Sequence, residues 1–142
     1  MAYDPNNIFA RIVRGEIPCV RVYEDADTLA FMDLMPQSDG HTLVIPKVAG
    51  ENLLDTPPGS VAAAIRTTQH VARAVKQAFE VPGLIVTQFN GTAAGQTVFH
   101  LHFHVIPVYA AGSLRLHARA QADASTLEAH AARIRAVLAA AG

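Results

Sequence analysis

Apolar side chains recur every three or four residues in three stretches of the chain, which is typical of helices with one buried face. The first follows the capping pair Asn6–Asn7 and ends at Gly15. The second spans Pro58–Phe79, with the proline tolerable in the first turn. The third follows Ser125, which forms a capping-box pattern with Glu128. The apolar positions are Ile8, Phe9, Ile12 and Val13; Val61, Ala64, Ile65, Val71, Ala72, Val75 and Phe79; and Leu127, Ala131, Ile134 and Leu138.

Shorter segments, apolar or alternating and bounded by turn residues, predict β-strands. The first two flank the turn Asp25–Asp27, the third stops at Pro46, and the glycine-containing loop Asn90–Gln96 separates the last two. Strands and helices are mixed without strict β-α-β alternation, so we expect an α+β domain with a largely antiparallel sheet. The predicted strands are Val20–Glu24, Thr28–Leu34, His41–Ile45, Gly83–Phe89 and Thr97–Ile106.

The composition indicates one folded domain covering residues 1–142. Hydrophobic residues make up 51% of the chain and charged residues 16%, which excludes a disordered protein. The formal net charge of -1 argues against a broad electrostatic surface for nucleic acids or anionic membranes, so we expect neither as a partner. Backbone N–H groups and histidines can still build a local phosphate site.

The sequence also limits the cellular compartment. Cys19 is the only cysteine, which excludes an internal disulfide and a cysteine-rich zinc site. The first seven residues lack the basic and apolar regions of a secretory signal, and no apolar run approaches the roughly 20 residues needed to span a bilayer. We therefore expect a cytoplasmic protein.

The most informative segment is Phe99–Ile106, in which every second position from 100 to 104 is a histidine. On a strand, His100, His102 and His104 would line one face, with successive side chains about 7 Å apart. Three neutral imidazoles at this spacing need more hydrogen-bond partners than a core usually supplies, which favours a functional role. The opposite face would pack against helices through Phe99, Leu101, Phe103 and Val105.

Two chemistries fit these imidazoles. A histidine pair two residues apart on a strand can chelate zinc, or one imidazole can attack phosphorus while its neighbours position the phosphate. The preceding loop favours phosphate chemistry, because Gly91 and Gly95 allow a close backbone approach and Gln96 and Thr97 offer donors. It is not a Walker loop, since it lacks the Gly-Lys-Ser/Thr ending and precedes a strand. His70, His117 and His130 lack such a context and are expected to be surface or packing residues.

The segment His100–Ile106 resembles the signature of the histidine triad (HIT) superfamily, in which three histidines alternate with apolar residues. Further segments are similar to the histidine triad nucleotide-binding, or Hint, branch of that superfamily. The similarity covers roughly residues 5–109, and residues from about 113 to 142 form a C-terminal extension. The further matching segments are Asn7–Pro18, Ala30–Leu34, Pro36–Gln37 and Gly40–Lys47.

The resemblance implies a HIT-like fold with a five-stranded antiparallel sheet and a homodimer with one continuous ten-stranded sheet. It implies hydrolysis of purine nucleoside 5′-phosphoramidates or related phosphoanhydrides through a covalent nucleotidyl-histidine, without a metal or other cofactor. His102 corresponds to the nucleophile, and the carbonyl of His100 would accept its other ring N–H. His104 and His41 would contact the phosphate or complete a hydrogen-bond relay.

The resemblance also implies residues that bind the nucleotide. Asp33 corresponds to the ribose-binding carboxylate, and the base would lie among Phe9, Phe31 and Leu34. The phosphate would contact the loop at Gly95, Gln96 and Thr97. Phe89 stands where the family usually carries Asn or Gln, so that polar contact is either missing or supplied by Asn90 or Gln88.

At some positions the sequence differs from the Hint pattern, and these differences leave alternative functions open. The extension from Ser113 replaces a tryptophan-containing tail that helps to shape leaving-group specificity in close Hint proteins, so the leaving group is not fixed. Ala10 and the lone Cys19 argue against the structural zinc site of some relatives. A dinucleoside polyphosphate hydrolase, a non-catalytic nucleotide-binding or scaffolding protein and a metal-dependent hydrolase remain alternatives. A nucleotidyltransferase is less favoured, because that branch replaces the last triad histidine with glutamine and His104 is present.

Overall fold

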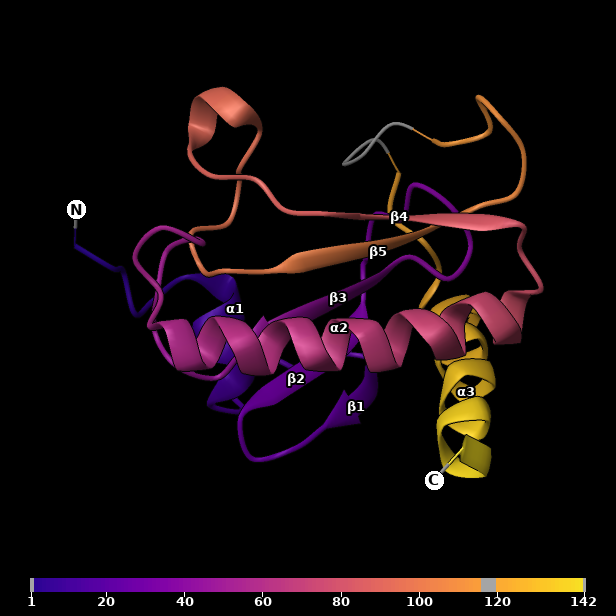
Figure 1. Ribbon diagram of the computed structural model, residues 1–142, viewed down its shortest axis with the longest axis horizontal. Coiled ribbons are helices and arrows are strands. Elements are labelled where there is room, and N and C mark those ends of the chain that lie inside the picture. The colour runs from indigo at the N-terminus through magenta and orange to yellow at the C-terminus, as the bar shows by residue number, and fades with distance from the viewer. Residues whose placement is uncertain (1, 116–119, 142) are drawn as a thin grey trace.

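The computed structural model describes residues 2–115 and 120–141. These residues form three helices, one short 3₁₀ turn and five strands. Figure 1 shows how the helices and strands are arranged. Their bounds are α1 (Ile8–Val13), β1 (Arg21–Glu24), β2 (Thr28–Met32), β3 (Thr42–Pro46), α2 (Pro58–Phe79), β4 (Gly83–Thr87), η1 (Thr92–Ala94), β5 (Phe103–Val108) and α3 (Ala124–Ala141).

The strands form one sheet in the order β1-β2-β3-β5-β4, and every neighbouring pair is antiparallel. The prediction of an α+β fold with a five-stranded antiparallel sheet, a short N-terminal helix, a long helix and a C-terminal helix is confirmed. The strands β1 and β4 are the two edges of this sheet. The interior strands β2 and β3 are buried along their whole length, so this part of the sheet is covered on both faces.

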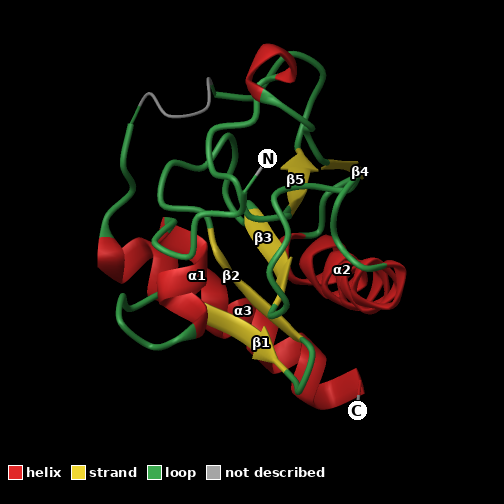
Figure 2. Ribbon diagram, turned by 90° about the vertical axis from the view of Figure 1, so that its left-hand side faces the viewer, coloured by secondary structure: helices red, strands yellow, loops and turns green. Residues whose placement is uncertain are grey.

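Alternation along β2 and β3 sends side chains into two separate cores. Ala30, Met32 and Val44 face α2 and α3, where they pack with Val71 and Leu127. Figure 2 shows α1 and α2 on opposite sides of the strands. The α1 face of the sheet therefore has its own core, formed by Phe9, Leu29, Phe31, Leu43 and Ile45.

The helix predictions hold closely. The α2 helix has the predicted bounds, and the Asn7 side chain caps α1 by accepting a hydrogen bond from the Ala10 N–H at 2.9 Å. The capping-box prediction for α3 is wrong, because the helix begins at Ala124 and Ser125 lies inside its first turn. The Glu128 carboxylate pairs instead with Arg135. No helix among the described residues is long and apolar enough to cross a membrane.

The predicted strand Thr97–Ile106 is wrong at its start, because β5 begins only at Phe103. The ladder to β3 starts there, with Phe103 opposite Val44. Before that point the Leu101 N–H donates to the Gly50 carbonyl oxygen at 3.0 Å rather than to a strand. His100 and His102 therefore lie on an irregular segment, and only His104 is on the sheet.

Other strand ends differ from the prediction by one or two residues. The β2 strand ends at Met32, so Asp33 and Leu34 follow the strand instead of belonging to it. Similarly, His41 precedes β3, whose last residue is Pro46. Phe89 lies beyond the end of β4, in the connection to η1. As a result, Asp33 and His41, two of the predicted site residues, lie just outside the strands, where their side chains are not part of the alternating pattern of the sheet.

The C-terminal extension returns to the segment that follows β2. The Arg115 N–H donates to the Gln37 carbonyl oxygen at 2.6 Å, and the Ala122 N–H donates to the Leu34 carbonyl oxygen at 2.9 Å. These bonds hold the chain near Asp33 while α3 packs against α2 on the other face of the sheet. His117 lies outside the described residues.

Candidate active site

The ring of His102 is fixed by the backbone of His100. Its Nδ1 lies 2.7 Å from the His100 carbonyl oxygen, which can only accept a hydrogen bond. The Nδ1 atom therefore carries the proton, and in the neutral ring Nε2 holds a lone pair. The ring also packs edge-on against Phe9, with ring centroids 4.9 Å apart. His102 thus has the tautomer and the restraint that a nucleophilic imidazole needs.

His100 itself is a buried ring with both nitrogens occupied. Its Nε2–H donates to the Pro46 carbonyl oxygen at 2.7 Å, and its Nδ1 accepts from the Tyr3 hydroxyl at 2.6 Å. Burial lowers the pKa of His100, and the bond to the Pro46 carbonyl offsets this only in part. The ring therefore stays neutral at pH 7 and serves to hold the backbone that orients His102.

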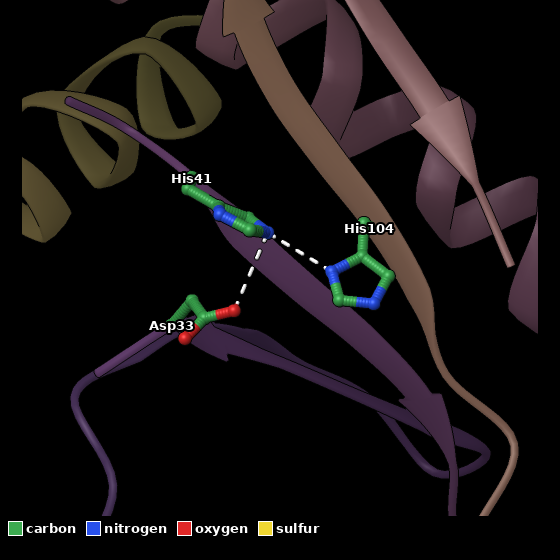
Figure 3. Close-up of side chains that lie close together, drawn as sticks. All are labelled: Asp33, His41 and His104. Atoms are coloured by element: carbon green, nitrogen blue, oxygen red, sulfur yellow. Dashed lines mark hydrogen bonds and ion pairs between the residues drawn. The ribbon is translucent and has the colours of Figure 1, made fainter. Parts of the chain in front are cut away.

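A second pair of imidazoles, His41 and His104, adjoins Asp33, as Figure 3 shows. The Gln37 N–H donates to His41 Nδ1 at 3.0 Å, so the proton of the neutral His41 ring is on Nε2. That Nε2 lies 3.0 Å from His104 Nδ1 and 3.3 Å from Asp33 Oδ2. Because His104 Nδ1 accepts this proton, the proton of His104 is on Nε2. The Gln37 backbone amide thus fixes the tautomer of His41, and His41 in turn fixes the tautomer of His104.

Asp33 is held at the end of β2 by a local turn. Its Oδ1 accepts a hydrogen bond from the Met35 N–H at 2.8 Å, and Oδ2 faces His41. Asp33 is buried, and it lines a cavity of about 300 Å³ between α1 and the sheet. The carboxylate is therefore pre-oriented at a cavity wall.

This cavity brings together most of the residues predicted to bind the nucleotide, and we call it the nucleoside pocket after that prediction. Its wall is mainly apolar, which suits a flat aromatic base, and two of the triad histidines lie at its polar end. The rings of Phe9 and Phe31 meet edge-on, with centroids 5.4 Å apart. The predicted residues that line it are Phe9, Phe31, Asp33, Leu34, Thr97, His102 and His104, joined by Ile8, Ile12, Ile17, Pro18, Cys19, Met32, Met35, Leu43 and Val98.

Gln96 differs from the expectation that its side chain faces the phosphate. Its Nε2 donates to the carbonyl oxygens of Glu51, at 2.6 Å, and Val98, at 3.0 Å. Its Oε1 accepts the Gly91 N–H at 2.8 Å. With both amide hydrogens used and the residue buried, Gln96 braces the loop instead of offering a donor to the pocket. Gly95 adopts φ +102°, which lets the loop turn back towards Thr97.

Gln88, Phe89 and Asn90 lie at the other side of this loop. Asn90 Oδ1 accepts from the Leu53 N–H at 3.0 Å and from Gln88 Nε2 at 2.7 Å, so these two amides bind each other and the neighbouring loop. The Phe89 ring is 37% exposed and meets the ring of His104 edge-on, with centroids 5.6 Å apart. Phe89 therefore lies at the candidate site beside His104, while the side chains of Asn90 and Gln88 bond to each other and to the neighbouring loop.

Asp33, His41 and His104 are also the described residues that could hold a metal ion. One nitrogen or oxygen from each lies within 4.8 Å of the others. Two imidazoles and a carboxylate are a donor set that zinc accepts. In this arrangement, however, the hydrogen bond between His41 and His104 uses two of the three donor atoms.

Sequence reasoning missed Tyr3, because no pattern signals a contact between the N-terminal segment and His100. It also missed the backbone groups of Gln37 and Pro46, which decide the tautomers. The pKa of Cys19 is raised by burial, in line with an inert thiol. His70 and His130 pack edge-on against Tyr23 and Phe79, so the expectation of surface or packing roles holds for both.

The chain is similar to several known proteins. A family model for the HIT domain matches residues 14–111. The Bacillus subtilis protein named Protein hit is 43% identical over 107 residues, which are 75% of this chain and 74% of that protein. Adenylylsulfatase HINT3 of Arabidopsis thaliana is 40% identical over 116 residues, which are 78% of this chain and 59% of HINT3. A crystal structure of a HIT-like protein from Bartonella henselae, described as involved in cell-cycle regulation and bound to an unknown ligand, is 51% identical with a TM-score of 0.90. The match covers 96% of this chain and 99% of the Bartonella henselae chain.

Proposed function

Because the chain belongs to the HIT family of nucleotide-binding hydrolases and transferases, we propose that it hydrolyses nucleoside 5′-phosphoramidates, of the AMP-amine type, or related phosphoanhydrides. One observation carries the proposal. The His100 carbonyl holds the Nδ1–H of His102, which leaves Nε2 with a lone pair at the polar end of the nucleoside pocket. A fixed neutral imidazole in that place suits nucleophilic attack on phosphorus.

In the first step, His102 Nε2 attacks the phosphorus atom and forms a P–N bond. The bond between phosphorus and the leaving amine breaks, and the amine nitrogen keeps its electron pair. That nitrogen takes a proton from solvent, while His104 Nε2–H donates a hydrogen bond to it. The hydrogen bond from His41 Nε2–H to His104 Nδ1 keeps the proton of His104 on Nε2, where it faces the leaving group.

In the second step, water attacks the phosphorus of the nucleotidyl-histidine. Its proton passes to solvent, the bond to His102 Nε2 breaks, and AMP is released with the His102 ring restored. Splitting one displacement into two lowers the barrier of each, and fixed N–H donors stabilise the charge that develops on the phosphoryl oxygens. In this scheme Thr97 contacts the phosphate and Gln96 positions the loop.

The nucleoside part would lie between α1 and the sheet. Phe9 and Phe31 supply apolar ring faces and edges for a purine, and Leu34 lies at the rim with 47% of its surface exposed. Asp33 is an acceptor-only group when ionised, so it suits the two vicinal hydroxyls of ribose. We propose these roles on the strength of their shared position in one pocket.

We also propose that two copies pair through β4. This strand is an edge of the sheet, and its residues Ile85 and Val86 are exposed, as is Ile65 on the neighbouring α2. An apolar edge is covered when two copies join their sheets, which would give ten continuous strands. Sedimentation should give a dimer at micromolar concentration, and Ile65→Lys should shift it towards monomer. A wild-type monomer would contradict the proposal.

The decisive experiment for the activity is rapid quenching of the protein with AMP phosphoramidate. Turnover and an acid-labile nucleotidyl group on His102 are expected, and His102→Ala should lose both while it still binds AMP. His104→Ala should slow the reaction without removing the adduct. Binding of AMP without any turnover would leave a non-catalytic nucleotide-binding protein.

Adenosine 5′-phosphosulfate is a second candidate substrate. The observation that favours it is the 40% identity to adenylylsulfatase HINT3. The same two steps apply, with a P–O bond broken and sulfate leaving without a need for a proton. A dinucleoside polyphosphate is a third substrate to include, and relative kcat/KM values for the three rank them.

A further inference from the structure

A second hollow, which we call the acidic groove, adjoins the nucleoside pocket. It has a volume of about 770 Å³ and shares Ile8, Thr97 and Val98 with the wall of that pocket. Two carboxylate residues, Asp4 and Glu51, line it, and none of its described lining residues is Lys, Arg or His. The groove therefore combines a position next to the phosphate site with a negative wall.

Glu51 is an unusual residue in this wall. It is only 6% exposed, yet its carboxylate has no hydrogen bond or ion pair with any residue in the ranges 2–115 and 120–141. In that part of the chain no fully buried side-chain nitrogen or oxygen lacks a partner, so the Glu51 oxygens must reach a surface. The surface that Glu51 lines is the acidic groove. The carboxylate thus meets solvent at the groove, where a cation that enters can pair with it without breaking an existing contact.

The backbone holds Glu51 in place from two sides. Its N–H donates to Asp55 Oδ2 at 3.1 Å, and its carbonyl oxygen accepts from Gln96 Nε2 at 2.6 Å. Gln96 in turn accepts from the Gly91 N–H, so Glu51 is tied to the loop that leads to Thr97. The position of the carboxylate is thus coupled to the loop beside the reacting phosphate.

We infer that the acidic groove is the leaving-group subsite and that it takes a leaving group with a second, protonated amine. This inference rests on the proposed function. With the nucleoside in its pocket and the phosphate beside His102, the leaving group passes Thr97 and enters the groove. An ammonium group there pairs with Glu51, and Asp4 adds to the negative potential. An anionic leaving group such as sulfate meets two carboxylates and is disfavoured.

The test compares two AMP phosphoramidates of equal chain length, N-(4-aminobutyl) and N-pentyl. Wild-type protein should hydrolyse the aminobutyl conjugate with kcat/KM about tenfold higher, a typical gain for a charge-assisted hydrogen bond. Glu51→Gln keeps the shape and removes the charge, so the ratio should fall to near one while the pentyl conjugate changes by less than about twofold. Glu80→Gln makes the same change at an exposed glutamate outside the groove and should keep the wild-type ratio. Raising the salt concentration should lower the ratio in wild type only.

The outcomes separate this inference from the proposed function. Equal rates for both conjugates in wild type, or an unchanged ratio in Glu51→Gln, would overturn the cationic subsite and leave the hydrolase standing. Equal losses with both conjugates in Glu51→Gln would assign Glu51 a structural role and also overturn it. If wild type hydrolysed neither conjugate, the proposed function would fail. The dissociation constants of the two conjugates then decide the subsite, since equal values in wild type would overturn it.

Discussion

The carbonyl oxygen of His100 accepts the Nδ1–H of His102 at 2.7 Å, so the backbone of one triad histidine sets the tautomer of the next. The His100 ring has a different task, because it ties that backbone to Pro46 on β3 and to Tyr3 in the N-terminal segment. The reactive ring is therefore only as well placed as the chain around His100. If His102 is the nucleophile that we propose, this relationship makes Tyr3 a positioning residue for chemistry that it does not touch.

Tyr3→Phe should lower kcat several-fold with little change in KM. The substitution removes the donor to His100 Nδ1 and leaves a buried acceptor without its bond, which should also cost about 1 kcal/mol of unfolding free energy. Steady-state kinetics and urea denaturation measure the two effects. Tyr109→Phe is the control for the loss of one tyrosine hydroxyl, because the Tyr109 hydroxyl donates to the Asp39 carbonyl oxygen and not to the His100 segment. An unchanged kcat in Tyr3→Phe would show that the His100 segment keeps its position without this bond.

Acid should destabilise the fold through His100. Burial lowers its pKa below the ordinary value of about 6.5, so the unfolded chain binds a proton at a pH where the folded chain does not. The unfolding free energy should therefore fall as the pH falls below about 6.5. His100→Gln should be less stable at pH 7 but show a flatter decline on acidification. His130, whose pKa burial also lowers, supplies a comparison in His130→Gln. An equal slope in wild type and His100→Gln would remove His100 as a cause.

Much of this architecture follows from local patterns. The α2 helix has its predicted bounds because its apolar period is long and regular, and the strand interiors follow from short apolar runs. The irregular conformation of residues 97–102 was not predicted, because their hydrogen bonds go to distant parts of the chain. An example is the bond from the Leu101 N–H to the Gly50 carbonyl oxygen. The role of Gln96 was missed for a similar reason. Its side chain bonds to Gly91 and Val98 in its own loop and to Glu51 and Asn52 in the preceding one. Residue type alone does not show whether such a side chain holds a loop in place or binds a ligand.

Phe89→Asn should maintain or raise the rate with AMP-type substrates. The aromatic ring lies beside His104, where an amide would add a polar contact for the phosphate. Because Phe89 is more than one-third exposed, the substitution should change the unfolding free energy by less than about 1 kcal/mol. Parallel measurement of kcat/KM and thermal unfolding tests both statements. A large loss of stability together with activity would show that Phe89 is a packing residue.

Asp33→Ala should weaken binding of AMP more than binding of 2′,3′-dideoxy-AMP. Charge-assisted hydrogen bonds to ribose hydroxyls are each worth about 1.5–3 kcal/mol, and the dideoxy ligand cannot make them. Calorimetric titration of both ligands measures the difference, with Asp39→Ala as the control at an exposed carboxylate. Asp33 also faces His41 Nε2 at 3.3 Å. Equal losses for the two ligands would therefore assign Asp33 to the histidine pair instead of the ribose.

Activity should survive exhaustive treatment with EDTA, and added zinc should inhibit. Zinc could be held by Asp33, His41 and His104, but only if His41 Nε2 gives up its proton. The proton would then have to move to Nδ1, which already accepts from the Gln37 N–H, so metal binding breaks the chain of tautomers that ends at His104 Nε2–H. Asp33→Asn removes the anionic ligand and should raise the zinc concentration needed for inhibition. Hydrolysis of AMP phosphoramidate at fixed free zinc measures this. Loss of turnover with EDTA and its recovery with zinc, with no nucleotide trapped on His102, would replace the covalent mechanism with a metal-dependent one.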